Sequence, residues 1–161
     1  MSLAISKVPV PHNEPVKDYA PGSPERASLE ATIARMSAHR IEIPLVIDGR
    51  EVSAGSLGRA VMPHRHAHVL ADFHQGGEAE VQMAIRAALR AQKDWAALPW
   101  EARASVFLKA AELLQGPYRD VVNAATMLGQ SKTCHQAEID SACELIDFFR
   151  FNVAFYEQVL R

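Results

Sequence analysis

The chain has 161 residues, of which 48% are hydrophobic and 22% are charged, a balance typical of a folded domain with a sizeable core. Its formal net charge of −2 argues against nucleic acid or an anionic membrane surface as the main partner. No apolar run approaches the roughly 18 residues of a membrane span, and the N-terminus lacks the apolar segment of a signal peptide.

Residues 1–22 are expected to form an extended arm, because four prolines between Pro9 and Pro21 interrupt any regular element. Two states stay open for this arm. It is either disordered, or it lies along a surface that later residues provide. Residues 23–161 are interpreted as one incomplete domain.

The first helix is predicted to begin after Ser23, a residue type that caps helices, with Pro24 at its first position. Apolar side chains then recur at helical spacing until the helix ends near His39. Three of them form its apolar face: Leu29, Ile33 and Met36.

Residues 41–47 are rich in β-branched side chains and predict a strand. Asp48-Gly49 is a strong hairpin signal, and residues 51–53 form the returning strand. Because Pro44 has no N–H to donate, the first strand is expected to lie at a sheet edge or to bulge there.

A second antiparallel pair is predicted over residues 60–62 and 69–74, joined by a turn. The turn region contains His64, His66 and His68, which would share one face if they lay on a strand. Such a face could bind a metal ion. However, the neighbouring Pro63 and Arg65 favour a solvated turn, and we predict no metal site.

From Glu78 the apolar period becomes helical, and three helices are predicted. They begin near residues 78, 100 and 118, and the third is expected to end at Gly129, a residue type that often terminates helices. The first of these helices carries an apolar stripe of Val81, Ile85, Ala88 and Leu89.

The last predicted helix starts around Thr133 and is apolar on two faces. One face is formed by Ile139, Ala142, Cys143, Ile146, Phe149 and Val153. The roughly opposite face is formed by Phe148, Phe151, Phe155 and Val159. A helix that is apolar on two faces must be covered on two sides. We therefore expect this chain to be part of a larger structure, or one half of an assembly.

Cys134 is placed at the start of this helix and close to Lys132, and both features would lower a thiol pKa. A nucleophile also needs an oriented base and an oxyanion site, and the sequence indicates neither. We predict no catalytic residue here. Cys134 and Cys143 would lie on opposite faces of the helix, so they cannot form a disulfide, and a reducing, cytoplasmic setting is favoured.

The acidic residues of the same helix are interpreted mainly as a solvated face that suits the helix dipole. Glu138 is the exception. On a helical projection it lies beside the first apolar stripe rather than among the other acids, so it could point into a crevice.

Several segments in order resemble the N-terminal region of the aldehyde dehydrogenase superfamily. They are Lys93-Asp94-Trp95-Ala96-Ala97-Leu98-Pro99, Phe107-Leu108-Lys109-Ala110-Ala111-Glu112-Leu113-Leu114, Met127-Leu128-Gly129-Gln130-Ser131-Lys132-Thr133 and Phe149-Arg150-Phe151. Four more, Glu14-Pro15-Val16, Tyr19-Ala20-Pro21-Gly22-Ser23, Gln136-Ala137-Glu138-Ile139-Asp140 and residues 144–152, narrow the resemblance to the branch that oxidises glutamate semialdehyde in proline breakdown.

The resemblance implies an α/β family, of which this part is mostly α-helical with a few short antiparallel strands. It implies NAD as the cofactor and a small-molecule substrate, glutamate semialdehyde, which is oxidised to glutamate. The family's catalytic cysteine, its general base and its cofactor-binding strands lie beyond the matched region, so Cys134 is not that nucleophile. By the same match, Glu138 could border the substrate pocket, where a carboxylate suits a cationic nitrogen.

We therefore expect an inactive scaffold that belongs to the NAD-binding domain of such a dehydrogenase, with no cofactor-binding residue of its own. Its partners would be the remainder of the enzyme or other copies of the chain. The alternative is a stand-alone helical interaction module that self-associates or binds a partner.

Overall fold

A computed structural model gives the fold and describes residues 7–160. The elements in chain order are α1 (Pro24–Ala38), β1 (Ile41–Ile43), β2 (Leu45–Ile47), β3 (Arg50–Val52), β4 (Ser56–Met62), β5 (Arg65–Gln75), α2 (Glu78–Ala97), α3 (Trp100–Gln115), α4 (Arg119–Gln130), α5 (Cys134–Ala137), a π-helical segment (Glu138–Cys143) and α6 (Glu144–Leu160). The prediction of a mostly helical chain with short strands is confirmed. Within the described range, no helix is long and apolar enough to cross a membrane.

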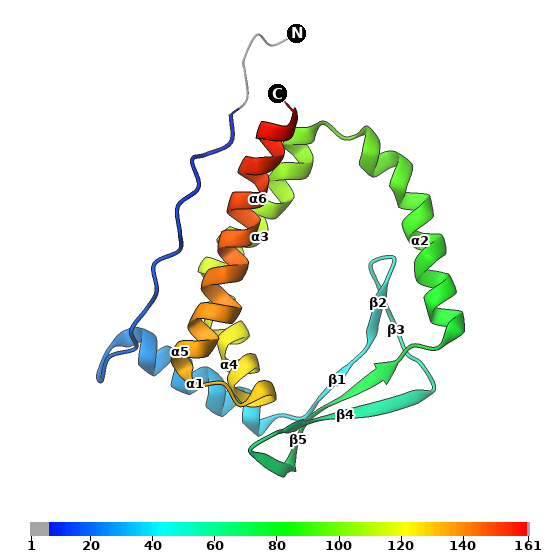
Figure 1. Cartoon of the computed structure of the whole chain (residues 1–161). Coiled ribbons are helices and arrows are strands. Elements are labelled where there is room, and N and C mark those ends of the chain that lie inside the picture. The colour runs from blue at the N-terminus through cyan, green and yellow to red at the C-terminus, as the bar shows by residue number, and fades with distance from the viewer. Residues whose placement is uncertain (1–6, 161) are drawn as a thin grey trace.

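The helices other than α2 form one body. Helix α3 packs along α6, α1 packs against α4, and α4 contacts the segment that joins α5 to α6. Figure 1 shows the strands at one end of this body and α2 standing apart from it, linked to it through α3. Buried side chains gather in two clusters, one around Leu29 and Ala124 and one around Ala111 and Ile146.

The start of α1 is formed as predicted. The Ser23 side chain accepts a hydrogen bond from the backbone N–H of Arg26, and Pro24 occupies the first turn. Leu29 is buried, and Ile33 and Met36 pack against the same cluster. The predicted apolar face of this helix is therefore confirmed.

The strands differ from the prediction at Pro44, which ends one strand and lets a second begin. β1 pairs with β5 in parallel, whereas β2 pairs with β3 in a separate antiparallel hairpin. The expectation of one continuous strand and of antiparallel pairing only was therefore wrong. The hairpin turn itself is confirmed, since Asp48 and Gly49 both have positive φ, as a type I′ turn requires.

The second predicted pair is confirmed in longer form as β4 and β5, which complete a three-stranded sheet in the order β1-β5-β4. Its turn is limited to Pro63 and His64, so His66 and His68 lie on β5. At Gly58, a Cβ atom would lie 2.3 Å from the ring of Phe73. A glycine therefore allows the close approach of these two strands.

The C-terminus of α4 lies two residues beyond the predicted one. Gly129 is inside the helix, and Ser131 adopts the left-handed conformation that ends it, with φ 57. The Ser131 hydroxyl lies 2.7 Å from Nδ1 of His64, and this contact ties the end of α4 to the β4–β5 turn. Serine seldom adopts the left-handed conformation, and at Ser131 this conformation is accompanied by the contact with His64.

The long C-terminal helix begins where predicted, with Thr133 as a cap that exchanges hydrogen bonds with Gln136. It is interrupted by the π-helical segment, which the sequence pattern did not predict. The first apolar face is confirmed, because Ala142, Cys143, Ile146 and Val153 are buried.

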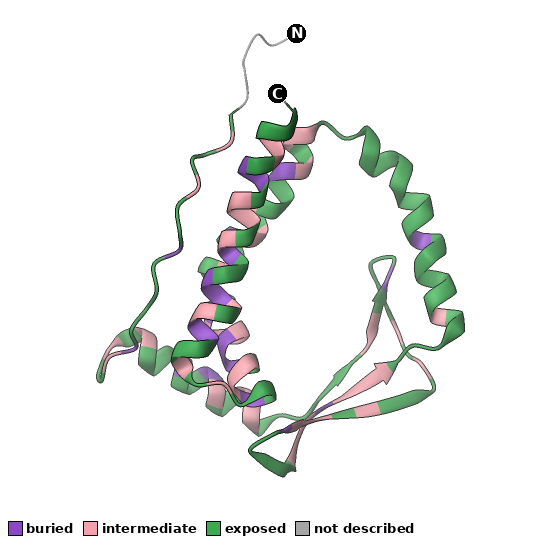
Figure 2. Cartoon of the chain, in the orientation of Figure 1, coloured by how far each residue is buried: buried purple, intermediate pink, exposed green. Residues whose placement is uncertain are grey.

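Most of the second face of this helix is open to solvent, whereas Phe151 is half-buried. Phe148 is 59% exposed and Phe155 is 53% exposed, so other described residues do not enclose them. Helix α2 is similar: its predicted stripe is formed, yet Val81, Ile85 and Leu89 are all exposed and only Ala87 of this helix is buried. Figure 2 shows α2 almost entirely in the colour of exposed residues. These two apolar surfaces lack the cover that the sequence pattern requires.

Candidate functional site

The arm is the first component of the candidate site. Its described part, residues 7–22, contains no helix or strand and follows the helical body (Figure 1). Its backbone N–H groups bind acidic side chains of the C-terminal helix: Glu14 donates to Asp147 at 2.7 Å, and Lys17 donates to Glu138 at 2.8 Å. Of the two states left open by the sequence, the described part adopts the docked one.

Glu138 is the centre of a buried polar network. It is the first residue of the π-helical segment and has no exposed surface. Its Oε2 accepts hydrogen bonds from the Tyr19 hydroxyl and from Asn123 Nδ2, both at 2.8 Å. Its Oε1 accepts the Lys17 N–H and also forms an ion pair with Arg119. Both carboxylate oxygens are therefore fully bonded.

Arg119 joins this carboxylate to the arm. It lies at the start of α4, and its side chain is only 3% exposed. Its Nη1 donates to Glu14 at 2.5 Å, and Nη2 donates to the carbonyl of Pro15 at 2.8 Å. Glu14 is itself buried and also binds Arg150 of α6 at 2.8 Å. Two guanidinium groups and two carboxylates thus connect the arm, α4 and α6.

The network keeps its carboxylate ionised. Burial alone would raise the pKa of Glu138, but hydrogen bonds from Arg119, Lys17, Tyr19 and Asn123 outweigh burial and lower this pKa to about 2. The same pairing raises the pKa of Arg119 above its ordinary value, although burial acts against it. The pKa of Tyr19 is raised by burial and by its hydrogen bond to Glu138. At neutral pH the site therefore holds a carboxylate, a guanidinium and a neutral phenol.

Cys143 borders the network without a catalytic environment. Its thiol lies 3.7 Å from Glu138 Oε1 and 3.5 Å from Arg119 Nη2. Burial, followed by the negative charge of Glu138, raises the pKa of this thiol to about 11. Cys143 is therefore protonated at neutral pH and acts as a small buried side chain.

Cys134 does not have the lowered pKa that its sequence position predicted. Lys132 forms an ion pair with Asp140, so its charge is compensated by that carboxylate. Partial burial and the Glu138 charge raise the pKa of the Cys134 thiol, and the Arg26 charge lowers it by less. The expected lowering of this pKa was wrong, because burial and the Glu138 carboxylate raise the pKa of the thiol.

The three alternating histidines do not converge. His64 contacts Ser131, whereas His68 Nε2 lies 2.9 Å from the backbone carbonyl of Ser37. Within residues 7–160, no group of three or more His, Cys, Asp or Glu side chains is placed to hold a metal ion.

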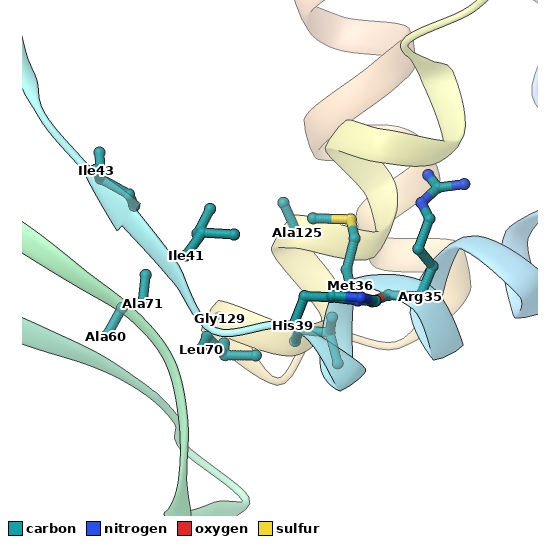
Figure 3. Close-up of a pocket in the computed structure, with 11 residues that line it drawn as sticks. Arg35, Met36, His39, Ile41, Ile43, Ala60, Leu70, Ala71, Ala125 and Gly129 are labelled. Carbon is teal, nitrogen blue, oxygen red and sulfur yellow. The ribbon is translucent and has the colours of Figure 1, made fainter. Parts of the chain in front are cut away.

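A half-open apolar groove of about 600 Å³ lies between α1, α4 and the three-stranded sheet. Figure 3 shows side chains from all three regions around it, including Met36, Ile41, Leu70 and Ala125. The polar side chains among its lining residues are Arg35 and His39. The groove is therefore suited to apolar packing rather than to proton transfer or nucleophilic attack.

The partners of Glu138 were not predicted from the sequence, although a signal for them was present. Three of the segments that narrow the resemblance, 14–16, 19–23 and 136–140, meet at this network and supply Glu14, Tyr19 and Glu138. Arg119 and Asn123 are one helical turn apart on α4, which places both on the face that receives the arm. Helical spacing alone does not distinguish such buried polar residues from solvated ones.

The chain that forms this fold and this network is a member of an enzyme family. Residues 53–160 match the model of the aldehyde dehydrogenase family, and the chain belongs to that family.

Its similar proteins include delta-1-pyrroline-5-carboxylate dehydrogenases. The protein of that name from Agaricus bisporus is 49% identical over 158 residues, which are 98% of this chain and 29% of that protein. The mitochondrial one from Homo sapiens is 44% identical over 143 residues, which are 89% of this chain and 25% of that protein. The crystal structure from Mycobacterium tuberculosis, bound with NAD, has a TM-score of 0.97 and 53% identity, and covers 99% of this chain and 30% of that one. The chain thus spans less than a third of the length of these relatives.

Proposed function

We propose that the chain forms the N-terminal part of the NAD-binding domain of a delta-1-pyrroline-5-carboxylate dehydrogenase. The whole enzyme would oxidise glutamate semialdehyde, a small-molecule substrate, to glutamate with NAD as the cofactor. The single observation that carries the proposal is the similarity of nearly the whole chain to enzymes of that name, at up to 49% identity among the curated relatives. The solved relative bound with NAD supports the choice of cofactor.

Within that enzyme the chain would act as scaffold and would be inactive alone. Its two thiols have raised pKa values, and the candidate network contains no nucleophile with an oriented base. The exposed apolar sides of α2 and α6 support contacts with further parts of the enzyme. Assembly of several copies is a second way to cover them, and this homo-oligomer stays a prediction, as does the cytoplasmic location.

A substrate-binding role for Glu138 also stays a prediction. Its complete burial and its full set of hydrogen bonds favour a different role, in which it holds the arm and α4 at fixed positions. Kinetics of Glu138→Gln in an enzyme of full family length distinguish the two. Loss of affinity for the aldehyde with unchanged thermal stability supports contact with substrate, whereas a large drop in melting temperature supports the positioning role.

The proposed function is tested by reconstitution. The 161-residue chain is co-expressed with the part of a close relative that this chain does not cover, and NADH formation from glutamate semialdehyde is followed by absorbance. The expected result is activity in the purified complex and none in either part alone. A complex that forms but gives no NADH with this aldehyde would refute the assigned substrate.

A further inference from the structure

The most informative group outside the network is His74, near the end of β5. Its side chain is only 7% exposed, although it lies in a small sheet with little core around it. The ring connects three parts of the chain: β5 itself, β1 through Glu42, and the link between β3 and β4 through Ala54. That link joins the β2–β3 hairpin to the three-stranded sheet.

Nδ1 of His74 faces both polar groups of one residue. The Ala54 N–H points at this nitrogen at 2.9 Å, and the Ala54 carbonyl oxygen lies 2.8 Å from the same nitrogen. Only one of these two bonds can exist at a time, because a ring nitrogen either carries a proton and donates or lacks one and accepts. The choice depends on the protonation state of the ring.

Glu42 determines which neutral tautomer is present. Its carboxylate lies 2.6 Å from Nε2, so Nε2 must carry a proton to avoid placing a lone pair against a negative charge. In the neutral ring Nδ1 is then bare and accepts the Ala54 N–H. In the imidazolium both nitrogens carry protons, Nδ1–H donates to the Ala54 carbonyl, and the Ala54 N–H loses its acceptor.

We propose that His74 is a pH-dependent switch. Protonation of the ring changes the hydrogen-bond partner of Nδ1 from the Ala54 N–H to the Ala54 carbonyl, and this changes the conformation of the 53–55 link between the β2–β3 hairpin and the three-stranded sheet. Only a slight rotation of the 53–55 link is needed for this exchange, because the Ala54 N–H and the Ala54 carbonyl are both already within hydrogen-bond distance of Nδ1. The switch does not depend on the proposed enzymatic function.

The charged groups around the ring favour its protonated form. Glu42 is the charged group that faces it from β1, Leu57 is the apolar residue opposite it on β4, and residues 53–55 carry no charge. Asp72, two residues away on β5, forms an ion pair with Arg40 and lies opposite Arg59 of β4, so its charge is compensated. The hydrogen bond to Glu42 and the contact with Ala54 together raise the pKa of His74 above its ordinary value, so the protonated ring persists to higher pH.

The test is NMR spectroscopy of the 161-residue chain across about pH 5 to 9. Ring ¹⁵N shifts of His74 should report a proton on Nε2 and none on Nδ1 at the alkaline end. The Ala54 amide resonance should titrate with the same midpoint as the ring. An Nδ1–H tautomer at alkaline pH, or an Ala54 amide that does not titrate, would overturn the proposal.

Two variants provide the controls. Glu42→Gln is expected to lower the shared midpoint towards that of an ordinary histidine, because it removes the facing negative charge. Glu51→Gln is the matched control. It removes the same charge from β3 of the hairpin rather than from the carboxylate that contacts His74, and it should leave the midpoint unchanged. If both variants shift the midpoint equally, general charge rather than the Glu42 contact sets it, and the proposal fails.

Discussion

Replacing Glu138 with glutamine tests whether the buried network fixes the arm to the helical body. Glutamine keeps the shape of the side chain but removes its charge, so Arg119 loses one of its two carboxylate partners. The pKa of Glu138 falls from its ordinary 4.5 to about 2 on folding, and each pH unit between these values is worth about 1.4 kcal/mol. Ionised Glu138 therefore stabilises the fold by about 3 kcal/mol, similar to the effect of breaking other buried ion pairs.

The free energy of unfolding that Glu138→Gln loses is expected to become smaller as the pH falls. A carboxylate with a lowered folded-state pKa contributes stability above its unfolded pKa, and this contribution disappears as the pH falls through the folded value. Urea unfolding of Glu138→Gln should give a free energy of unfolding about 3 kcal/mol below wild type at pH 7. This difference should shrink between pH 4.5 and about pH 2.

Asp140→Asn is the matched control, because Asp140 lies two residues away and its ion pair with Lys132 is partly exposed to solvent. It should change the free energy of unfolding by less than about 1 kcal/mol. The reasoning is refuted if Glu138→Gln lies within about 0.5 kcal/mol of wild type at neutral pH, or if its difference stays constant down to pH 2.

Three further substitutions probe other features, each by thermal or urea unfolding unless stated. Gly58→Ala forces a methyl group into the facing aromatic ring and should destabilise by about 1–3 kcal/mol, whereas Gly55→Ala, with nothing within 4 Å, should not. Gly129→Ala, inside α4 with open space around it, should stabilise by about 0.5–1 kcal/mol; a loss would contradict its helical placement. The double variant Phe148→Ser, Phe155→Ser should reduce self-association in analytical ultracentrifugation and should change the unfolding free energy by less than about 1 kcal/mol. Unchanged association would show that the exposed apolar face of α6 does not mediate self-association.

Local signals in the sequence predicted most of the elements. The Ser23-Pro24 start, the Asp48-Gly49 turn and the Thr133 cap all depend on residues adjacent in the chain, and all three are confirmed. The apolar stripe that includes Ile146 was also identified from helical spacing alone.

The errors arose where distant residues decide the local structure. Pro44 separates β1 from β2, and β1 pairs in parallel with β5, a pairing that has no local sequence signal. Ser131 rather than Gly129 ends α4, and its hydroxyl contacts His64, which is far away in sequence.

The candidate site was predicted only as a single acidic residue. Glu138 was distinguished by its angular position on the helix, but its partners Glu14, Tyr19 and Arg119 lie on other elements. Their convergence requires the arm to dock, and the sequence left that docking undecided. A π-helical segment at Glu138 also changes the angular spacing that a helical projection assumes.

The proposed scaffold role implies that a complete NAD site needs residues in addition to those of this chain. Calorimetric titration with NAD tests it most directly, on the 161-residue chain alone and on its purified complex with the remainder of a close relative. No binding heat is expected for the chain alone, and saturable binding is expected for the complex. Stoichiometric binding of NAD by the chain alone would contradict it.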